Sequence, residues 1–287
     1  KGIDGYSEVQ SDIKGTELYN TLDSYIPSIA GNDLTLTIDY QIQVMCENAI
    51  KKIMEVEKPK SAQILVMDPN TGEIIADAIK PSFNLNEPPR DNVEELLSSS
   101  KNLSIVDVYE PGSTFKVLTT ASALEEKVTS LEDRFYDPGY RIVDGERINC
   151  WRLHGHGSQS MVDGLNNSCN SVFVDLALRL GKDKMYSYFE KYGFGNLTNV
   201  DFSGESAGII MDKDTAKKVD LARMGFGQAI AVTPLQQIRA ISSVVNGGTL
   251  YRPYFVSKIS SSTGSFEKNF SPVAVRNVIS SETSANI

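Results

Sequence analysis

The sequence is poor in several features that would mark whole classes of protein. It has three cysteines in 287 residues, too few for a disulfide scaffold. No run of about 18 apolar residues occurs in it, so the sequence itself contains no candidate membrane-spanning helix. Lys and Arg number 28 against 37 Asp and Glu, which gives a net charge of −9 with no basic stripe. We therefore expect no nucleic-acid partner.

The remaining composition is that of an ordinary globular protein. Hydrophobic residues make up 40% of the chain and charged residues 23%. The length suits one large domain, or a large domain with a small companion. Because the chain begins at Lys1 and not at a methionine, we expect it to be a piece of a longer protein, with anchors or domains outside it.

The order of the expected elements indicates an α+β fold rather than alternating βαβ units. Residues 1–34 are polar and predict an irregular or partly helical entry segment. Strands, then helices, then a further strand follow. The expected elements are a strand at 33–39, a helix at 40–57 capped by Asp39, a hairpin at 61–78, helices at 113–126, 161–181 and 183–191, a helix from Thr233-Pro234 to Asn246, and a strand at 249–262.

The stretch "EPGSTFK" places Ser113 three residues before Lys116, directly after Pro111-Gly112. Positions i and i+3 of a helix lie on one face, so the hydroxyl and the amine can meet. A lysine whose pKa is lowered by burial can take the proton of a serine and make it a nucleophile. Backbone N–H groups at the helix start can form half of an oxyanion hole. Taken alone, the spacing is common, and it favours a helix-start serine beside a surface lysine over a catalytic pair.

A second stretch, Ser168-Cys169-Asn170, precedes an apolar helical segment. The Ser168 hydroxyl could relay a proton between a lysine and a leaving amine, and the Asn170 amide could bind a substrate carbonyl. The structural alternative is a helix cap built from the same two residues. A third stretch, "GFGQAIAVTPLQ", alone indicates only a Gly-rich turn before a capped helix.

Taken together, these stretches resemble the transpeptidase domain of class B penicillin-binding proteins of the elongation or sporulation type. The resemblance rests on "EPGSTFK", "GHGSQSMVDGLNNSCN", "GFGQAIAVTPLQ" and "NGGTLYRPY" in this order, and "LTIDYQIQ", "MDPNTGEIIADA" and "SGESAG" fit the same family. It covers about residues 1–287. Residues 1–34 would match the end of an N-terminal pedestal or linker region, and residues 35–287 a transpeptidase domain without its C-terminal part. The implied fold is the penicillin-binding or serine transpeptidase fold, an antiparallel sheet flanked by helices, with a helical subdomain that carries Ser-x-x-Lys.

The resemblance also implies roles for four residues. Ser113 would be the acylated nucleophile, Lys116 its general base, and Ser168 and Asn170 the second motif. The implied reaction is cross-linking of peptidoglycan stem peptides by D,D-transpeptidation, without a catalytic cofactor. Expected partners are stem peptides, β-lactam antibiotics and a membrane glycan polymerase. The protein would act outside the cytoplasm of a bacterium, tethered to the cell membrane by an anchor outside this sequence.

The sequence departs from the family in one place. The third family motif, Lys-Thr-Gly, is absent. Thr263-Gly264 follows a serine instead and has the context of a hairpin tip. We expect the motif to lie beyond Ile287. Three alternatives remain open: a β-lactam-sensing domain, a serine β-lactamase, for which no deacylating Glu motif is recognisable, and a non-catalytic scaffold of a cell-wall synthesis complex.

The two histidines of the sequence, His154 and His156, follow Cys150 closely in "CWRLHGHG". This spacing is not that of a zinc finger, and a turn histidine with a Cys150–Cys169 disulfide or free thiols is one interpretation. Elongation-type members of the family hold a structural zinc in the corresponding places. The resemblance therefore implies four ligands, Asp137, Cys150, His156 and Cys169, with His154 in reserve. Cys150 stands where those members have Asp.

Overall fold

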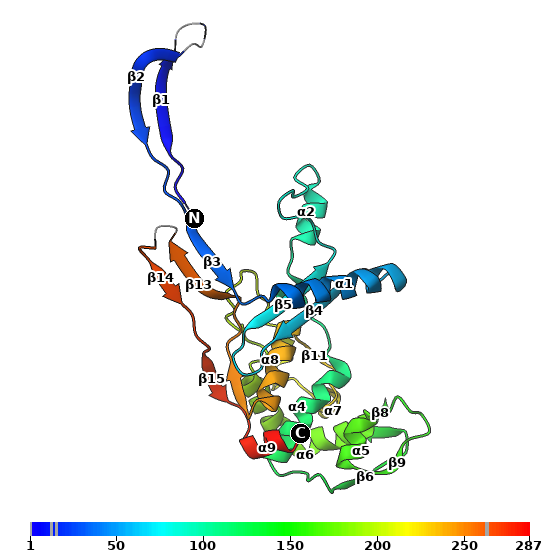
Figure 1. Ribbon diagram of the computed structural model, residues 1–287. Helices are drawn as coiled ribbons and strands as arrows, with labels where there is room; N and C mark the ends of the chain where they lie inside the picture. Colours follow the sequence, from blue (N-terminus) through cyan, green and yellow to red (C-terminus); the bar gives the residue numbers. More distant parts are fainter. Residues whose placement is uncertain (1, 12–13, 15–16, 262–263) are drawn as a thin grey trace. The chain divides into compact units, whose positions relative to one another are not determined.

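The computed structural model describes residues 2–11, 14, 17–261 and 264–287. The chain divides into two compact units. One consists of residues 1–37 and 256–271, and the other of residues 38–255 and 272–287. Each unit is described by itself (Figure 1).

The first unit consists of antiparallel strands. Strands β1 and β2 form a hairpin in which Tyr6 pairs with Ile26, and β13 pairs with both β14 and β3. The elements are β1 (Tyr6–Ser11), β2 (Glu17–Ile26), β3 (Asn32–Leu36), β13 (Val256–Ser261) and β14 (Glu267–Asn269).

The irregular or partly helical segment expected over residues 1–34 is therefore wrong, because most of it is a hairpin. The segment has many polar residues and no apolar alternation that would reveal strands. Its strands are held by backbone hydrogen bonds between β1 and β2. The hairpin tip expected around Thr263 involves residues 262–263, which lie outside the described residues.

The second unit carries the helices and the remaining strands. Its elements are α1 (Tyr40–Val56), β4 (Ala62–Met67), β5 (Ile74–Lys80), α2 (Val93–Ser99), α3 (Leu103–Val106), the 3₁₀ turn η1 (Gly112–Phe115), α4 (Lys116–Glu125), β6 (Arg134–Asp137), β7 (Tyr140–Val143), β8 (Glu146–Asn149), β9 (Gly157–Ser160), α5 (Met161–Asn166), α6 (Asn170–Tyr192), β10 (Ile209–Ile210), α7 (Lys218–Met224), β11 (Ile230–Ala231), α8 (Pro234–Val245), β12 (Thr249–Tyr251), β15 (Ala274–Asn277) and α9 (Ser281–Ala285).

Several sequence predictions for this unit are confirmed. Asp39 caps α1 by accepting hydrogen bonds from the backbone N–H groups of Gln41 and Ile42. Strands β4 and β5 form the expected hairpin, and Gly72 in its turn has a φ of 81°. Thr233 caps α8 in a capping box with Gln236.

Helices α4, α6, α7 and α8 lie together (Figure 1), and side chains from all four belong to the largest hydrophobic core of the described residues. Phe115 and Leu118 from the Ser-x-x-Lys segment are buried in this core beside Phe173 of α6 and Met224 of α7. The core holds the start of α4 against the start of α6, so it fixes the two motif-bearing segments relative to each other.

Two element predictions are wrong. The single helix expected at 161–181 is interrupted between α5 and α6, where Ser168 has a φ of 49°. The break expected near residue 182 is present instead as a kink at Gly181 inside α6. The strand expected at 249–262 is two strands, β12 and β13, because Pro253 between them has no N–H to donate to a ladder.

Candidate active site

The turn before α4 exposes Ser113. Gly112 donates a backbone hydrogen bond of 2.9 Å to the carbonyl of Gly227, and the two backbones touch. A Cβ atom at Gly227 would lie 2.2 Å from the Gly112 carbonyl oxygen, and Gly227 has a φ of 76°. Only glycine fits this contact, which explains Gly227, the second glycine of "GFGQ". The Gly-rich loop therefore supports the turn that presents the Ser113 hydroxyl to solvent.

Lys116, the first residue of α4, is 1% exposed and faces the start of α6. Its Nζ donates hydrogen bonds to the Ser168 carbonyl (2.7 Å), to Ser168 Oγ (2.9 Å) and to Asn170 Oδ1 (2.8 Å). It also lies 5.2 Å from the centre of the Phe173 ring. Burial lowers the pKa of Lys116 to about 8, although the nearby Cys150 and Cys169 oppose this change.

Ser168 is held in a left-handed backbone conformation that a non-glycine residue seldom adopts. This conformation lets both its carbonyl and its hydroxyl reach the same lysine. Strain of this kind persists where the surrounding structure enforces it, often at a functional site. Here the backbone N–H groups of Ser168 and Cys169 are bound by the carbonyls of Leu165 and Gly164 in α5.

The structure therefore brings Lys116, Ser168 and Asn170 into contact. Ser113 lies three residues before Lys116, and its hydroxyl forms no hydrogen bond with any other residue that the structure describes. An exposed hydroxyl, a buried amine with a lowered pKa and a second hydroxyl bound to that amine are the parts that serine acyl transfer requires.

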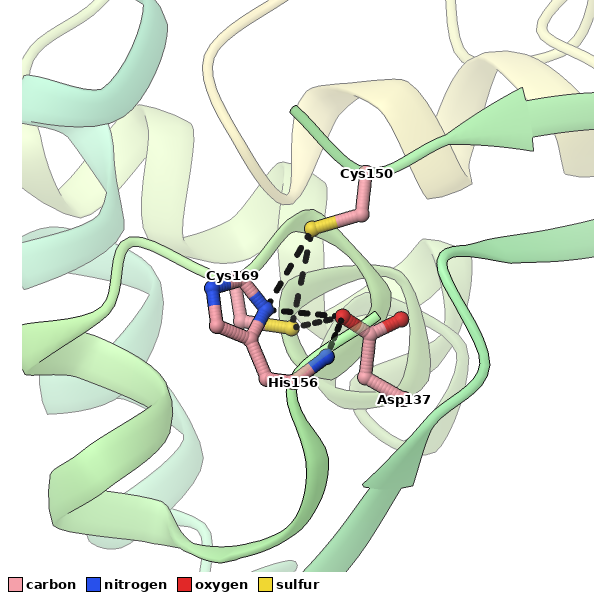
Figure 2. A group of neighbouring side chains, drawn as sticks. All are labelled: Asp137, Cys150, His156 and Cys169. Carbon is pink, nitrogen blue, oxygen red and sulfur yellow. Dashed lines mark hydrogen bonds and ion pairs between the residues drawn. The ribbon is translucent and has the colours of Figure 1, made fainter. Parts of the chain in front are cut away.

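Behind this cluster lie the four side chains expected to bind a metal. Asp137 ends β6, Cys150 follows β8, His156 precedes β9, and Cys169 lies directly before α6. Their ligand atoms all lie within 4.8 Å of one another, and Figure 2 shows them pointing toward a common centre. His154, the reserve ligand, is exposed and is not part of the group.

The distances within the group are close to those of a tetrahedral zinc site. Cys150 Sγ lies 3.9 Å from Cys169 Sγ and 3.7 Å from His156 Nδ1, and both thiols are free. Asp137 Oδ2 lies 3.2 Å from Cys169 Sγ and 2.8 Å from His156 Nδ1. In a tetrahedral zinc site, neighbouring ligand atoms are about 3.3–3.8 Å apart. The donor set therefore fits zinc after an opening of about half an ångström at the His156–Asp137 pair.

The other Asp137 oxygen is held from outside the group. Ser171 Oγ donates to Asp137 Oδ1 at 2.6 Å, and Gly139 N donates to the same oxygen at 2.7 Å. Burial would raise the pKa of Asp137, but the hydrogen bonds from Ser171, His156 and Gly139 outweigh it and hold this pKa well below its usual range. Burial, with the Asp137 carboxylate nearby, raises the pKa of the Cys169 thiol, so the thiol keeps its proton unless a cation displaces it.

The sequence did not reveal the supporting residues. Ser171 is 1% exposed and lies two residues after Cys169 on α6, a spacing that gives no signal for contact with β6. Trp151 donates a hydrogen bond to the Asn167 carbonyl and lies edge-on against the His156 ring. The tryptophan thus links the possible metal group to the segment before Ser168.

A mixed α+β domain in which Ser-x-x-Lys and Ser-x-Asn segments meet at one buried lysine belongs to the class of serine–lysine acyl-transfer proteins. Comparison with known proteins identifies the family. Residues 62–287 match the family described as penicillin binding protein transpeptidase domain, and the chain belongs to it.

Two known proteins and one solved structure illustrate the match. Over its whole length the chain is 39% identical to stage V sporulation protein D of Bacillus subtilis, of which it covers 44%. Over 88% of its length it is 30% identical to the peptidoglycan D,D-transpeptidase MrdA of Acinetobacter baumannii, of which it covers 39%. The crystal structure of penicillin binding protein 2X from Streptococcus thermophilus aligns over 99% of this chain and 41% of that chain, with a TM-score of 0.85 and 25% identity.

These findings confirm the expected fold and the resemblance to class B penicillin-binding proteins. The chain spans less than half the length of the two known proteins that it matches. Within the part of the chain that the structure describes, no helix is both long and apolar enough to cross a membrane.

Proposed function

We propose that this chain carries the acyl-transfer site of a D,D-transpeptidase that cross-links peptidoglycan stem peptides. The observation that carries the proposal is the burial of Lys116 against Ser168 and Asn170, one helical turn from Ser113. The names of the relatives, among them a peptidoglycan D,D-transpeptidase, support it. The match of this whole chain to 44% of a protein named for sporulation supports a role in spore formation.

In the first half-reaction, Ser113 Oγ bonds to the carbonyl carbon of the D-Ala-D-Ala peptide bond. The hydroxyl proton passes to the neutral Lys116 amine, whose lowered pKa makes this form accessible near neutral pH. The C–N bond then breaks, and the leaving D-Ala amine takes a proton through Ser168, which is bound to the lysine. The product is an ester on Ser113. β-Lactams would acylate the same serine oxygen as their ring C–N bond breaks, and the whole drug would remain attached.

In the second half-reaction, an amine of a neighbouring stem bonds to the ester carbon and the bond to Ser113 Oγ breaks. The proton that the amine loses passes through Ser168 to Lys116, and Lys116 returns a proton to Ser113 Oγ. We propose that Asn170, which is bound to Lys116, also orients the donor peptide.

We further propose that residues 35–287 form most of the transpeptidase domain. Lys-Thr-Gly, a membrane anchor and the contact with a glycan polymerase would belong to other parts of the protein.

The function is tested with the full-length protein, a fluorescent penicillin and a stem pentapeptide. We expect a stable penicillin adduct, together with release of D-Ala and a cross-linked peptide product. A stable adduct without any reaction of the peptide would indicate a sensing domain. Rapid release of hydrolysed drug would indicate a β-lactamase. If the protein is not labelled at all, it would instead be a non-catalytic scaffold.

We also propose that Asp137, Cys150, His156 and Cys169 hold a structural zinc ion. Support comes from the chemistry of the donor set, two thiols, an imidazole and a carboxylate around one centre. When bound, the ion would fix the segments on both sides of Ser168 without contacting substrate.

We expect about one zinc per chain in protein purified without chelator. His156→Ala should lose the metal, and His154→Ala should keep it. A Cys150–Cys169 disulfide in freshly prepared native protein would contradict the proposal.

A further inference from the structure

A small cavity lies beside the turn that carries Ser113. It has a volume of about 330 Å³ and is lined by Glu110, Ile209, Met211, Ala229, Ile230 and Ala231. Glu110 is the one charged residue in this lining. The proposed reaction as described above makes no use of this cavity.

The backbone pairing explains how the lining residues share one face. Tyr109 pairs with Val232, and Ala231 of β11 pairs with Ile209 of β10. Since side chains alternate along paired strands, Glu110 falls on the side of Ala231 and Ile209, opposite Tyr109. Val232 on the other side is buried, whereas Ile209 is 64% exposed. An apolar floor open to solvent thus lies next to a carboxylate.

The Glu110 carboxylate has one oxygen in use. Oε1 accepts a hydrogen bond of 2.8 Å from the backbone N–H of Ala229, which has a φ of 59°. Across the described ranges, Oε2 accepts no hydrogen bond, and no ion pair joins Glu110 to a Lys or Arg. The carboxylate therefore supports the loop with one oxygen and offers the other, with its negative charge, to the rim of the cavity.

We infer that this cavity binds the acceptor substrate of the reaction. The part that enters the cavity would be an aliphatic side chain of a peptide that ends in a primary ammonium group. The methylene groups would lie on Ile209 and Met211, and the ammonium would meet Glu110 Oε2. The inference rests on the proposed function, since transpeptidation requires an amine as its second substrate. Glu110 lies three positions before Ser113, which limits the distance between their Cα atoms to about 11 Å.

The chemical step balances without a further reagent. The bound ammonium gives one proton to water and becomes a nucleophilic amine. Its nitrogen bonds to the ester carbon, the bond from that carbon to Ser113 Oγ breaks, and the second nitrogen proton returns to Ser113 by way of Ser168 and Lys116. The products are an amide, the free serine and one released proton. Glu110 acts as a binding residue that concentrates the acceptor near the acyl-enzyme.

The substitution Glu110→Gln separates this role from a structural one. Glutamine keeps an oxygen for the Ala229 N–H and removes only the charge. Asp107→Asn is the matched control, because Asp107 is an exposed acid three residues earlier that does not line the cavity. Ile209→Lys is a second test, since its own ammonium would compete for Glu110 from an exposed position.

The experiment uses the full-length protein, a thioester analogue of the donor peptide and two acceptors. One acceptor is a peptide with a four-carbon amine side chain, and the other is glycinamide. Mass spectrometry gives the ratio of aminolysis to hydrolysis and the KM of each acceptor. We expect Glu110→Gln and Ile209→Lys to raise the KM of the long acceptor about tenfold, because each substitution removes one charge-assisted hydrogen bond to its ammonium group. The KM of glycinamide should remain almost unchanged.

Three other results would contradict either the role of Glu110 or the proposed function. If the wild-type protein forms the amide and Glu110→Gln has the same KM for the long acceptor, the inference is overturned. An equal rise in Asp107→Asn would also overturn it, because the effect would then be one of general charge. If the wild-type protein forms no acyl-enzyme with the thioester, the proposed function itself fails.

Discussion

At the scale of single residues, Lys116 determines how the site should respond to pH. Its amine accepts a proton only when neutral, and its pKa is about 8 because the side chain is buried. The neutral fraction rises with pH until the pH passes this pKa. We therefore expect the second-order rate constant of penicillin acylation to rise about tenfold from pH 6 to pH 7 and to level off above about pH 8.5.

Stopped-flow measurement with a fluorescent penicillin checks this profile. The control is Lys116→Ala, which should slow acylation by about 10²–10⁴-fold and remove the pH dependence. A flat wild-type profile from pH 6 to pH 9, or near wild-type acylation by Lys116→Ala, would exclude Lys116 as the base.

The chemistry of individual residues was easier to predict than their contacts. Ser113 and Lys116 are three residues apart on one turn, so their proximity follows from local geometry. The hydrogen bonds from Lys116 to Ser168 and Asn170 join positions more than 50 residues apart, and the sequence spacing does not contain that contact. Likewise, nothing local to Ser171 predicts that its hydroxyl binds Asp137.

At the scale of elements, the four possible zinc ligands come from three strand ends and one helix start. The ion would tie β6, β8 and β9 to the beginning of α6, where Ser168 and Asn170 flank Cys169. Part of the binding free energy of zinc would then be free energy of folding for this region.

We therefore expect Cys169→Ser to lower the melting temperature by roughly 5–10 °C and to slow penicillin acylation, although Ser113 is unchanged. Differential scanning calorimetry with and without a strong chelator measures the effect. Chelator should destabilise the wild-type protein and leave Cys169→Ser almost unaffected. A metal-free wild-type preparation with full stability and full acylation rate would argue against the zinc proposal.

Elements with strong local signals were predicted well, and those set by distant contacts were not. Asp39 and Thr233 cap their helices through hydrogen bonds to their own first turns, so the sequence alone predicts both starts. The break at Ser168 was missed although it lies in the polar run "NNSCNS", a local loop signal that interrupts the apolar pattern. Contacts with Lys116 and α5 then fix the conformation of Ser168.

At the scale of the whole molecule, the α+β class followed from the order of strands and helices, and the family from four motifs in a fixed order. The division of the chain was harder to anticipate. Residues 256–271 join the first unit because β13 pairs with β3, a strand more than 200 positions earlier. Pairing at such a separation is not encoded in local sequence.

Intact-mass spectrometry of the full-length protein with a penicillin tests whether Ser113 carries the acyl group. We expect the wild-type protein to gain the mass of one drug molecule, mapped by peptide digestion to Ser113. Ser113→Ala should gain none and keep its fold by circular dichroism, while Ser158→Ala, which changes an exposed serine on β9, should be acylated normally. Acylation of Ser113→Ala, or an adduct mapped to any other residue, would contradict the account.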